Sequence, residues 1–111
     1  MIEIDTEQRP EGFGVVTPRG RVNMVSARQL REALSGLVDA GCPRIALDLS
    51  QTSFLDSSGL GAIIAGLKTA RQAGGDLRIV APTPEVMAVF ELTNMHRLMQ
   101  PRESVDRAFD A

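Results

Sequence analysis

The chain has 111 residues, of which 43% are hydrophobic, and its formal net charge is −2. This length and composition fit one domain with a packed core and exclude a wholly disordered chain. Its basic and acidic residues are interspersed, and it has no Trp, no Tyr and four Phe. These features argue against a nucleic-acid surface, which needs a basic patch and stacking aromatic side chains. We also expect no membrane partner, because no apolar run approaches the length of a membrane span.

A cytoplasmic location is expected from the cysteine content and from the first residues. The single cysteine, Cys42, cannot form an internal disulfide, which fits a reducing compartment. The segment Met1-Ile2-Glu3-Ile4-Asp5 lacks the basic and apolar regions of a signal peptide.

Two short strands are predicted at the start of the chain. Residues 2–6 alternate apolar and polar side chains, and residues 13–17 form a second strand-like run. The turn Pro10-Glu11-Gly12 lies between them, so we predict a hairpin.

A helix is predicted next, because apolar residues recur at helical spacing. These residues are Leu30, Ala33, Leu34, Leu37 and Val38. Ser26 and Gln29 predict a capping box at the start of this helix. Gly41 predicts its end, since glycine tolerates the left-handed conformation of a C-terminal cap. Cys42 then occupies the turn before the next strand.

Two further strands are predicted over residues 45–49 and 77–81, with a second helix between them. One face of that helix carries Leu60, Ile63, Ile64 and Leu67, and Gly74-Gly75 ends it.

A third helix is predicted after residue 83. Thr83 is its expected N-cap, Pro84 its first residue and Asn94 its left-handed end. Its core-facing residues are Val86, Val89 and Phe90. A short strand near Leu98-Met99 and a last short helix capped by Ser104 complete the prediction.

This alternation of strands and helices predicts an α/β sheet with right-handed crossovers. Ligands of such sheets gather where strands end and the following helices begin. The segment Asp56-Ser57-Ser58-Gly59 lies at such a place.

Two interpretations of this segment remain open from the residues alone. Asp56, Ser57 and Ser58 all favour helix N-caps, so the segment is either a cap with polar neighbours or a phosphorylation site. Unsatisfied N–H groups at a helix start accept a phosphate, and phosphorylation of Ser57 would add about −1.5 to −2 charge units. Asp56 would oppose that charge. The surface would change its charge while the fold stayed in place, as a binding switch requires.

The face of the second helix opposite its core residues is small and uncharged. It comprises Gly59, Ala62, Gly66 and Thr69, with Gly61 and Ala65 nearby. Because a solvent-exposed face normally carries charge, we expect either a partner surface or a neighbouring helix of the same domain to cover it.

The stretch from Asp48 to Gly61 resembles the signature of STAS domains, which are named for sulfate transporters and anti-sigma factor antagonists. Within it, Asp56-Ser57-Ser58-Gly59-Leu60-Gly61 is similar to the pattern of the bacterial anti-anti-sigma branch. The segments 20–23, 74–77 and 84–93 are similar to other parts of the family. The resemblance therefore implies a single STAS domain over residues 1–111, with a mixed sheet of about five strands and about four helices.

This resemblance implies an anti-sigma factor antagonist that is not an enzyme and needs no cofactor. Such proteins bind an anti-sigma factor that is itself a serine kinase, and the sigma factor is then released. The kinase phosphorylates the first serine of the pair, here Ser57, which breaks the complex. A metal-dependent serine phosphatase restores binding.

The resemblance also assigns roles to the neighbours of Ser57. Asp56 would help to position the acceptor, and the contact surface would include Ser58, Gly59 and Leu60. The family often has aspartate where this chain has Asn23, which is expected close to the segment from Asp56 to Gly59. Asparagine keeps the ability to hydrogen-bond but removes one negative charge.

Other functions have weaker support in the sequence. A serine hydrolase would need a base beside its serine, but the only histidine, His96, is expected in an exposed loop. The Gly-x-Ser-x-Gly pattern of many hydrolases is also absent around Ser57. One His and one Cys far apart do not make a metal site. A nucleotide-binding STAS module would rest on Gly59-Leu60-Gly61 alone, without a phosphate-binding motif. A STAS subunit of another signalling or lipid-transport assembly also remains open.

Overall fold

The computed structural model describes residues 2–110 and shows an α/β fold with a five-stranded sheet and four α-helices. The elements in chain order are β1 (Glu3–Gln8), β2 (Gly14–Val22), α1 (Ala27–Asp39), β3 (Arg44–Asp48), β4 (Thr52–Leu55), α2 (Ser57–Gln72), β5 (Asp76–Val80), α3 (Pro84–Leu92), α4 (His96–Met99) and the 3₁₀ helix η1 (Val105–Arg107). The predicted fold class is confirmed. No helix within residues 2–110 has the length and apolar character needed to cross a bilayer.

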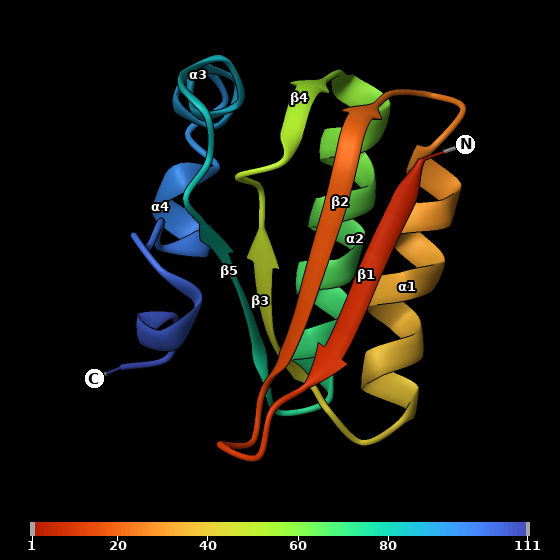
Figure 1. The fold of residues 1–111 in the computed structure, drawn as a ribbon, viewed down its shortest axis with the longest axis vertical. Coiled ribbons are helices and arrows are strands. Elements are labelled where there is room, and N and C mark those ends of the chain that lie inside the picture. Colours follow the sequence, from red (N-terminus) through yellow and green to blue (C-terminus); the bar gives the residue numbers. More distant parts are fainter. Residues whose placement is uncertain (1, 111) are drawn as a thin grey trace.

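The long strand β2 organises the sheet (Figure 1). It pairs antiparallel with β1 and parallel with both β3 and β4, while β5 pairs parallel with β3. The first residues of β2 face β3, whereas its last residues, Gly20 to Val22, face β4. As a consequence, β2 and β4 end at the same edge of the sheet, where α1 and α2 begin.

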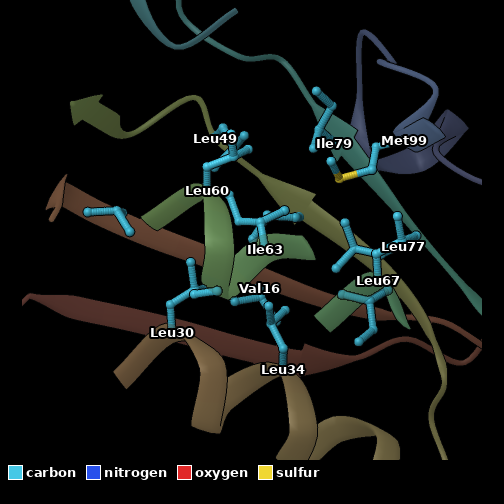
Figure 2. Close-up of a cluster of buried hydrophobic side chains, with 14 of the residues drawn as sticks. Val16, Leu30, Leu34, Leu49, Leu60, Ile63, Leu67, Leu77, Ile79 and Met99 are labelled. Atoms are coloured by element: carbon cyan, nitrogen blue, oxygen red, sulfur yellow. The ribbon is translucent and has the colours of Figure 1, made fainter. Parts of the chain in front are cut away.

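One face of the sheet is covered by α1 and α2, which pack against each other (Figures 1 and 2). Leu30 and Leu34 of α1 meet Ile63 and Leu67 of α2 in a fully desolvated cluster above Val16. Burial of each such side chain contributes about 1.5–3 kcal/mol. The predicted core faces of both helices are therefore confirmed.

The opposite face of the sheet is covered by the C-terminal segment. Alternate strand residues build a second apolar cluster there, which comprises Phe13, Val15, Ala46, Val80 and Ala108. The ring of Phe109 lies 5.4 Å from that of Phe13, between the guanidinium groups of Arg44 and Arg78 at 4.7 and 4.8 Å.

Four predicted helix boundaries are confirmed. Gly41 (φ +84°) and Gly74 (φ +87°) end α1 and α2 in the left-handed conformation, and Asn94 (φ +60°) does the same after α3. At the start of α3, the Thr83 side chain accepts a hydrogen bond from the Val86 N–H, and Pro84 is the first helical residue. These signals succeeded because each acts within a single helical turn.

The predicted capping box of α1 is wrong. Ser26 Oγ donates to the Arg21 carbonyl oxygen at 2.7 Å instead of capping the helix, and Gln29 Nε2 donates to the Ile2 carbonyl oxygen at 2.6 Å. Both side chains thus tie α1 to the strands beside it.

The C-terminal third also differs from the prediction. Leu98 and Met99 lie in α4 and not in a strand. The N–H groups of both residues donate to the Met95 carbonyl oxygen. The chain meets the sheet edge later, through a single bridge between Val80 and Arg102. The last helix is a 3₁₀ turn without a side-chain cap from Ser104. The strand β4, by contrast, was not predicted.

Candidate functional site

The candidate site is the turn from β4 into α2. Asp56 is the N-cap of α2, and its Oδ1 accepts a hydrogen bond from the Gly59 N–H at 2.9 Å. Neither Ser57 nor Ser58 forms a side-chain hydrogen bond to any described residue. Capping therefore explains Asp56 and leaves both serine hydroxyls unused.

The two serines differ in their exposure. Ser57, the first residue of α2, is exposed, whereas Ser58 is half-buried. The first turn of α2 contains no acidic residue, so its free N–H groups are offset only by Asp56 at the cap. Because Ser57 is the more exposed of the two serines, its hydroxyl is the accessible one.

The end of β2 lies directly against this turn. The Asp56 N–H donates to the Val22 carbonyl oxygen at 3.3 Å. A Cβ placed on Gly59 would lie 2.5 Å from the same oxygen and 2.6 Å from Leu55 Cδ1. Only glycine fits there without a shift of the backbone. Gly59, which was predicted as part of the partner-contact surface, therefore has a packing role.

Asn23 follows Val22 and is therefore brought beside the turn, as expected. Its Oδ1 accepts from the Val25 N–H at 3.0 Å and from the Ser26 N–H at 3.3 Å. The Asn23 N–H in turn donates to Ser26 Oγ at 3.0 Å. These bonds fix the loop between β2 and α1, and they use the same side-chain oxygen that an aspartate would supply.

This loop carries two exposed apolar side chains that were not predicted from the sequence. Met24 is 76% exposed and Val25 is 71% exposed. Their signal in the sequence is an apolar pair that precedes a helix but lies outside its core-facing spacing. Methionine is enriched in protein–protein interfaces, where its flexible side chain adapts to a partner surface.

Gly59 and Leu60 do not belong to the exposed surface of the site. Leu60 is 8% exposed and joins the main core, and Gly59 is also buried. In the free protein these two residues support the turn from beneath. The exposed surface at this edge is instead formed by Ser57 and Gly61 on α2, with Met24 and Val25 opposite.

The small face of α2 is partly filled by the domain itself. A Cβ on Gly66 would lie 2.5 Å from Leu34 Cδ1 of α1, and Ala62 is buried. Gly61 has no atom near its Cβ position, and Ala65 and Thr69 stay half-buried. The neighbouring-helix interpretation is therefore confirmed at Gly66, whereas cover by a partner stays a prediction for Gly61, Ala65 and Thr69.

The residues available for catalysis are not gathered around Ser57. His96 is half-buried at the start of α4, with Nδ1 3.3 Å from the Phe90 carbonyl oxygen, and is not in an exposed loop as predicted. Cys42 is buried beside Gly14, and burial raises the pKa of its thiol. Within residues 2–110 no cluster of three or more His, Cys, Asp or Glu side chains is arranged to hold a metal ion.

The fold and this turn define a small α/β domain that presents a serine hydroxyl at a helix N-terminus. The family model of the STAS domain matches residues 3–108. The chain belongs to the STAS domain family.

The similar proteins described next are named as anti-sigma factor antagonists. It is 31% identical over 107 residues to the anti-sigma factor antagonist BtrV of Bordetella bronchiseptica, which covers 94% of this chain and 92% of that protein. It is 28% identical over 105 residues to the anti-sigma-B factor antagonist of Staphylococcus aureus, with 95% and 94% covered. The crystal structure of an anti-sigma factor antagonist from Mycobacterium paratuberculosis superposes with a TM-score of 0.86 at 28% identity, over 97% of this chain and 91% of that one.

Proposed function

We propose that this protein is an anti-sigma factor antagonist whose binding is switched by phosphorylation of Ser57. Its unphosphorylated form binds an anti-sigma factor serine kinase in the cytoplasm and thereby frees the sigma factor. The kinase ends the complex by phosphorylating Ser57, and a serine phosphatase restores it. The single observation that carries this proposal is the exposed, unbonded Ser57 hydroxyl on the first residue of α2.

The geometry favours Ser57 over Ser58 as the acceptor. A kinase must reach the hydroxyl oxygen with the γ-phosphate of ATP, and only the Ser57 side chain is exposed. Since Asp56 already supplies the cap, neither serine is needed to hold the helix start. Ser57 is therefore free to carry a modification without loss of the fold.

A phosphate on Ser57 changes the surface and leaves the framework in place. It adds about −1.5 to −2 charge units next to free N–H groups of α2, which accept anions. Asp56 opposes part of this gain by like-charge repulsion. A partner that fits the neutral turn then meets a charged and bulkier one, which disfavours binding.

We also propose that the protein is not itself an enzyme. A serine nucleophile requires a base within hydrogen-bond reach, and the Ser57 hydroxyl has no such partner among the described residues. The site fits a substrate of a kinase better than a catalyst.

Mass spectrometry of the protein purified from its own cells tests the proposal. We expect one phosphate, mapped to Ser57, which is absent from Ser57→Ala and retained in Ser58→Ala. Ser57→Ala should keep its kinase partner in the presence of ATP, whereas Ser57→Asp should lose the partner and keep its melting temperature. A phosphate on Ser58 only would overturn Ser57 as the acceptor and assign the switch to Ser58. No phosphate, even after incubation with that kinase and ATP, would overturn the switch and indicate a constitutive binding subunit.

A further inference from the structure

A groove of about 670 Å³ lies between α1 and α2 and reaches the turn that carries Ser57, because Ser58 is one of its lining residues. Both helices start at the same edge of the sheet, and Ser58 lines the groove at that edge. The groove therefore adjoins the proposed phosphorylation site.

The two walls of the groove differ in chemistry. The α2 wall is made of small residues, chiefly Gly61 and Ala65, and a Cβ on Gly61 would meet nothing within 4 Å. The α1 wall carries the long polar side chains of Arg28, Arg31 and Glu32. Such a shape lets a polypeptide segment approach the α2 backbone closely while its side chains meet the charges on α1.

The charge of the groove is positive. Arg28 Nε lies 3.3 Å from Glu32 Oε1, so these two charges offset each other. Arg31 is exposed and forms no ion pair with any residue between 2 and 110. One guanidinium group thus remains free, and guanidinium groups pair preferentially with carboxylates.

We propose that this groove receives an acidic segment of the kinase partner, with Arg31 as its main charge contact. The inference rests on the proposed function and adds to it the chemistry of the partner. A phosphate on Ser57 then acts in a second way, because it places negative charge at the mouth of the groove and repels the acidic segment.

Charge reversal at Arg31 tests the proposal, with Arg107→Glu as a matched control. Arg107 is also exposed and lies in η1, on the C-terminal segment that packs on the other face of the sheet. The probe is the anti-sigma factor kinase recovered with Ser57→Ala, and Kd is measured at several salt concentrations. We expect Arg31→Glu to weaken binding at least about tenfold and to reduce its salt dependence, and Arg107→Glu to change it by less than about twofold. Equal Kd values for Arg31→Glu and the unsubstituted protein would overturn the proposal that the groove binds an acidic segment through Arg31.

A second experiment separates the groove from the proposed function. Amide chemical shifts of the isotope-labelled protein are followed by NMR during titration with a hexaglutamate peptide, with hexalysine as the control. Shifts confined to Arg31, Gly61 and Ala65, and lost in Arg31→Glu, support an acidic ligand even if no kinase binds. Shifts spread over all exposed arginines, or none along the groove, would show that it does not select acidic chains. If the kinase binds normally in that case, only the groove inference has failed.

Discussion

The carbonyl oxygen of Val22 accepts a hydrogen bond from the N–H of Asp56, at 3.3 Å, and so joins the end of β2 to the cap of α2. Val22 and Asp56 are far apart in sequence, and parallel pairing of β2 with β4 brings them together. The loop that carries Asn23 and the turn that carries Ser57 are therefore held as one unit. A rigid frame of this kind lets a change of charge at Ser57 be read by a partner without a change of fold.

The cap of α2 should be sensitive to loss of the Asp56 oxygen. Asp56→Ala removes the acceptor of the Gly59 N–H, and we expect the free energy of unfolding to fall by about 1 kcal/mol. Asp56→Asn keeps an acceptor oxygen and should stay close to the unsubstituted protein. Urea denaturation measures both variants. An equal loss in Asn and Ala would show that the carboxylate charge, and not the cap bond, stabilises the turn.

Two glycines of α2 should respond to alanine in opposite directions. At Gly59 the added Cβ would lie 2.5 Å from the Val22 carbonyl oxygen, so we expect a loss of about 1–3 kcal/mol in the free energy of unfolding. Around the Cβ position of Gly61 no residue between 2 and 110 outside its own helical turn lies within 4 Å, and the better helix propensity of alanine should stabilise the protein by about 0.5–1 kcal/mol. Thermal denaturation of the pair provides the comparison. A neutral Gly59→Ala would mean that β2 and α2 can separate at little cost.

The loop before α1 should depend on the side-chain oxygen of Asn23. Asn23→Ala leaves the Val25 and Ser26 N–H groups without this acceptor, and we expect a cost of about 1 kcal/mol. Asn23→Asp keeps the oxygen and places a negative charge near the start of α1, where it is favourable. Chemical denaturation should therefore rank the aspartate variant at or above the unsubstituted protein. If aspartate and alanine were equally destabilised, the amide N–H group would be the important part of Asn23.

Local signals predicted the helix ends well, whereas distant pairings escaped the sequence analysis. Gly41, Gly74 and Thr83 act on N–H and carbonyl groups within one turn, so their positions in the sequence were sufficient. Ser26 failed as a cap because its hydroxyl bonds the Arg21 carbonyl oxygen, and Gln29 failed because it bonds Ile2 across 27 residues. A side chain that bonds a backbone group outside its own helix does not cap that helix, whatever its residue type predicts.

The strands show the same limit. Residues 52–55 are too short and too polar to predict β4, which exists because the extended end of β2 offers a parallel partner. Leu98 and Met99 are apolar, but leucine and methionine favour helices, and the N–H groups of both residues donate to the carbonyl oxygen of Met95 in a helical turn. A cap within residues 56–58 was predictable from residue type, but not which of Asp56, Ser57 and Ser58 supplies it. The exposure of Met24 and Val25 was not predictable, because it depends on which way the loop leaves the sheet.

The C-terminal segment should be held by the ring of Phe109. This ring lies between Arg44 and Arg78 and against Phe13, and Arg78 also donates to the Ala108 carbonyl oxygen at 3.0 Å. Phe109→Leu keeps apolar bulk but removes the aromatic face, so each cation–π contact is lost at about 0.5–1 kcal/mol. A double-mutant cycle with Arg44→Met should return a coupling energy of that size by urea denaturation. Strict additivity of the two substitutions would show that Phe109 and Arg44 are not coupled through a cation–π contact.

The thiol of Cys42 should be protected in the folded protein. Cys42 is buried, and burial raises the pKa of its thiol, so little reactive thiolate forms near neutral pH. We expect the native protein to react with an aromatic disulfide reagent at least about tenfold more slowly than the urea-unfolded chain. A raised pKa in the folded state also means that the unfolded thiol loses its proton first, so the free energy of unfolding should fall as the pH rises above the ordinary thiol pKa. Cys42→Ala should remove that alkaline decline, and its persistence in this variant would assign the decline to another group.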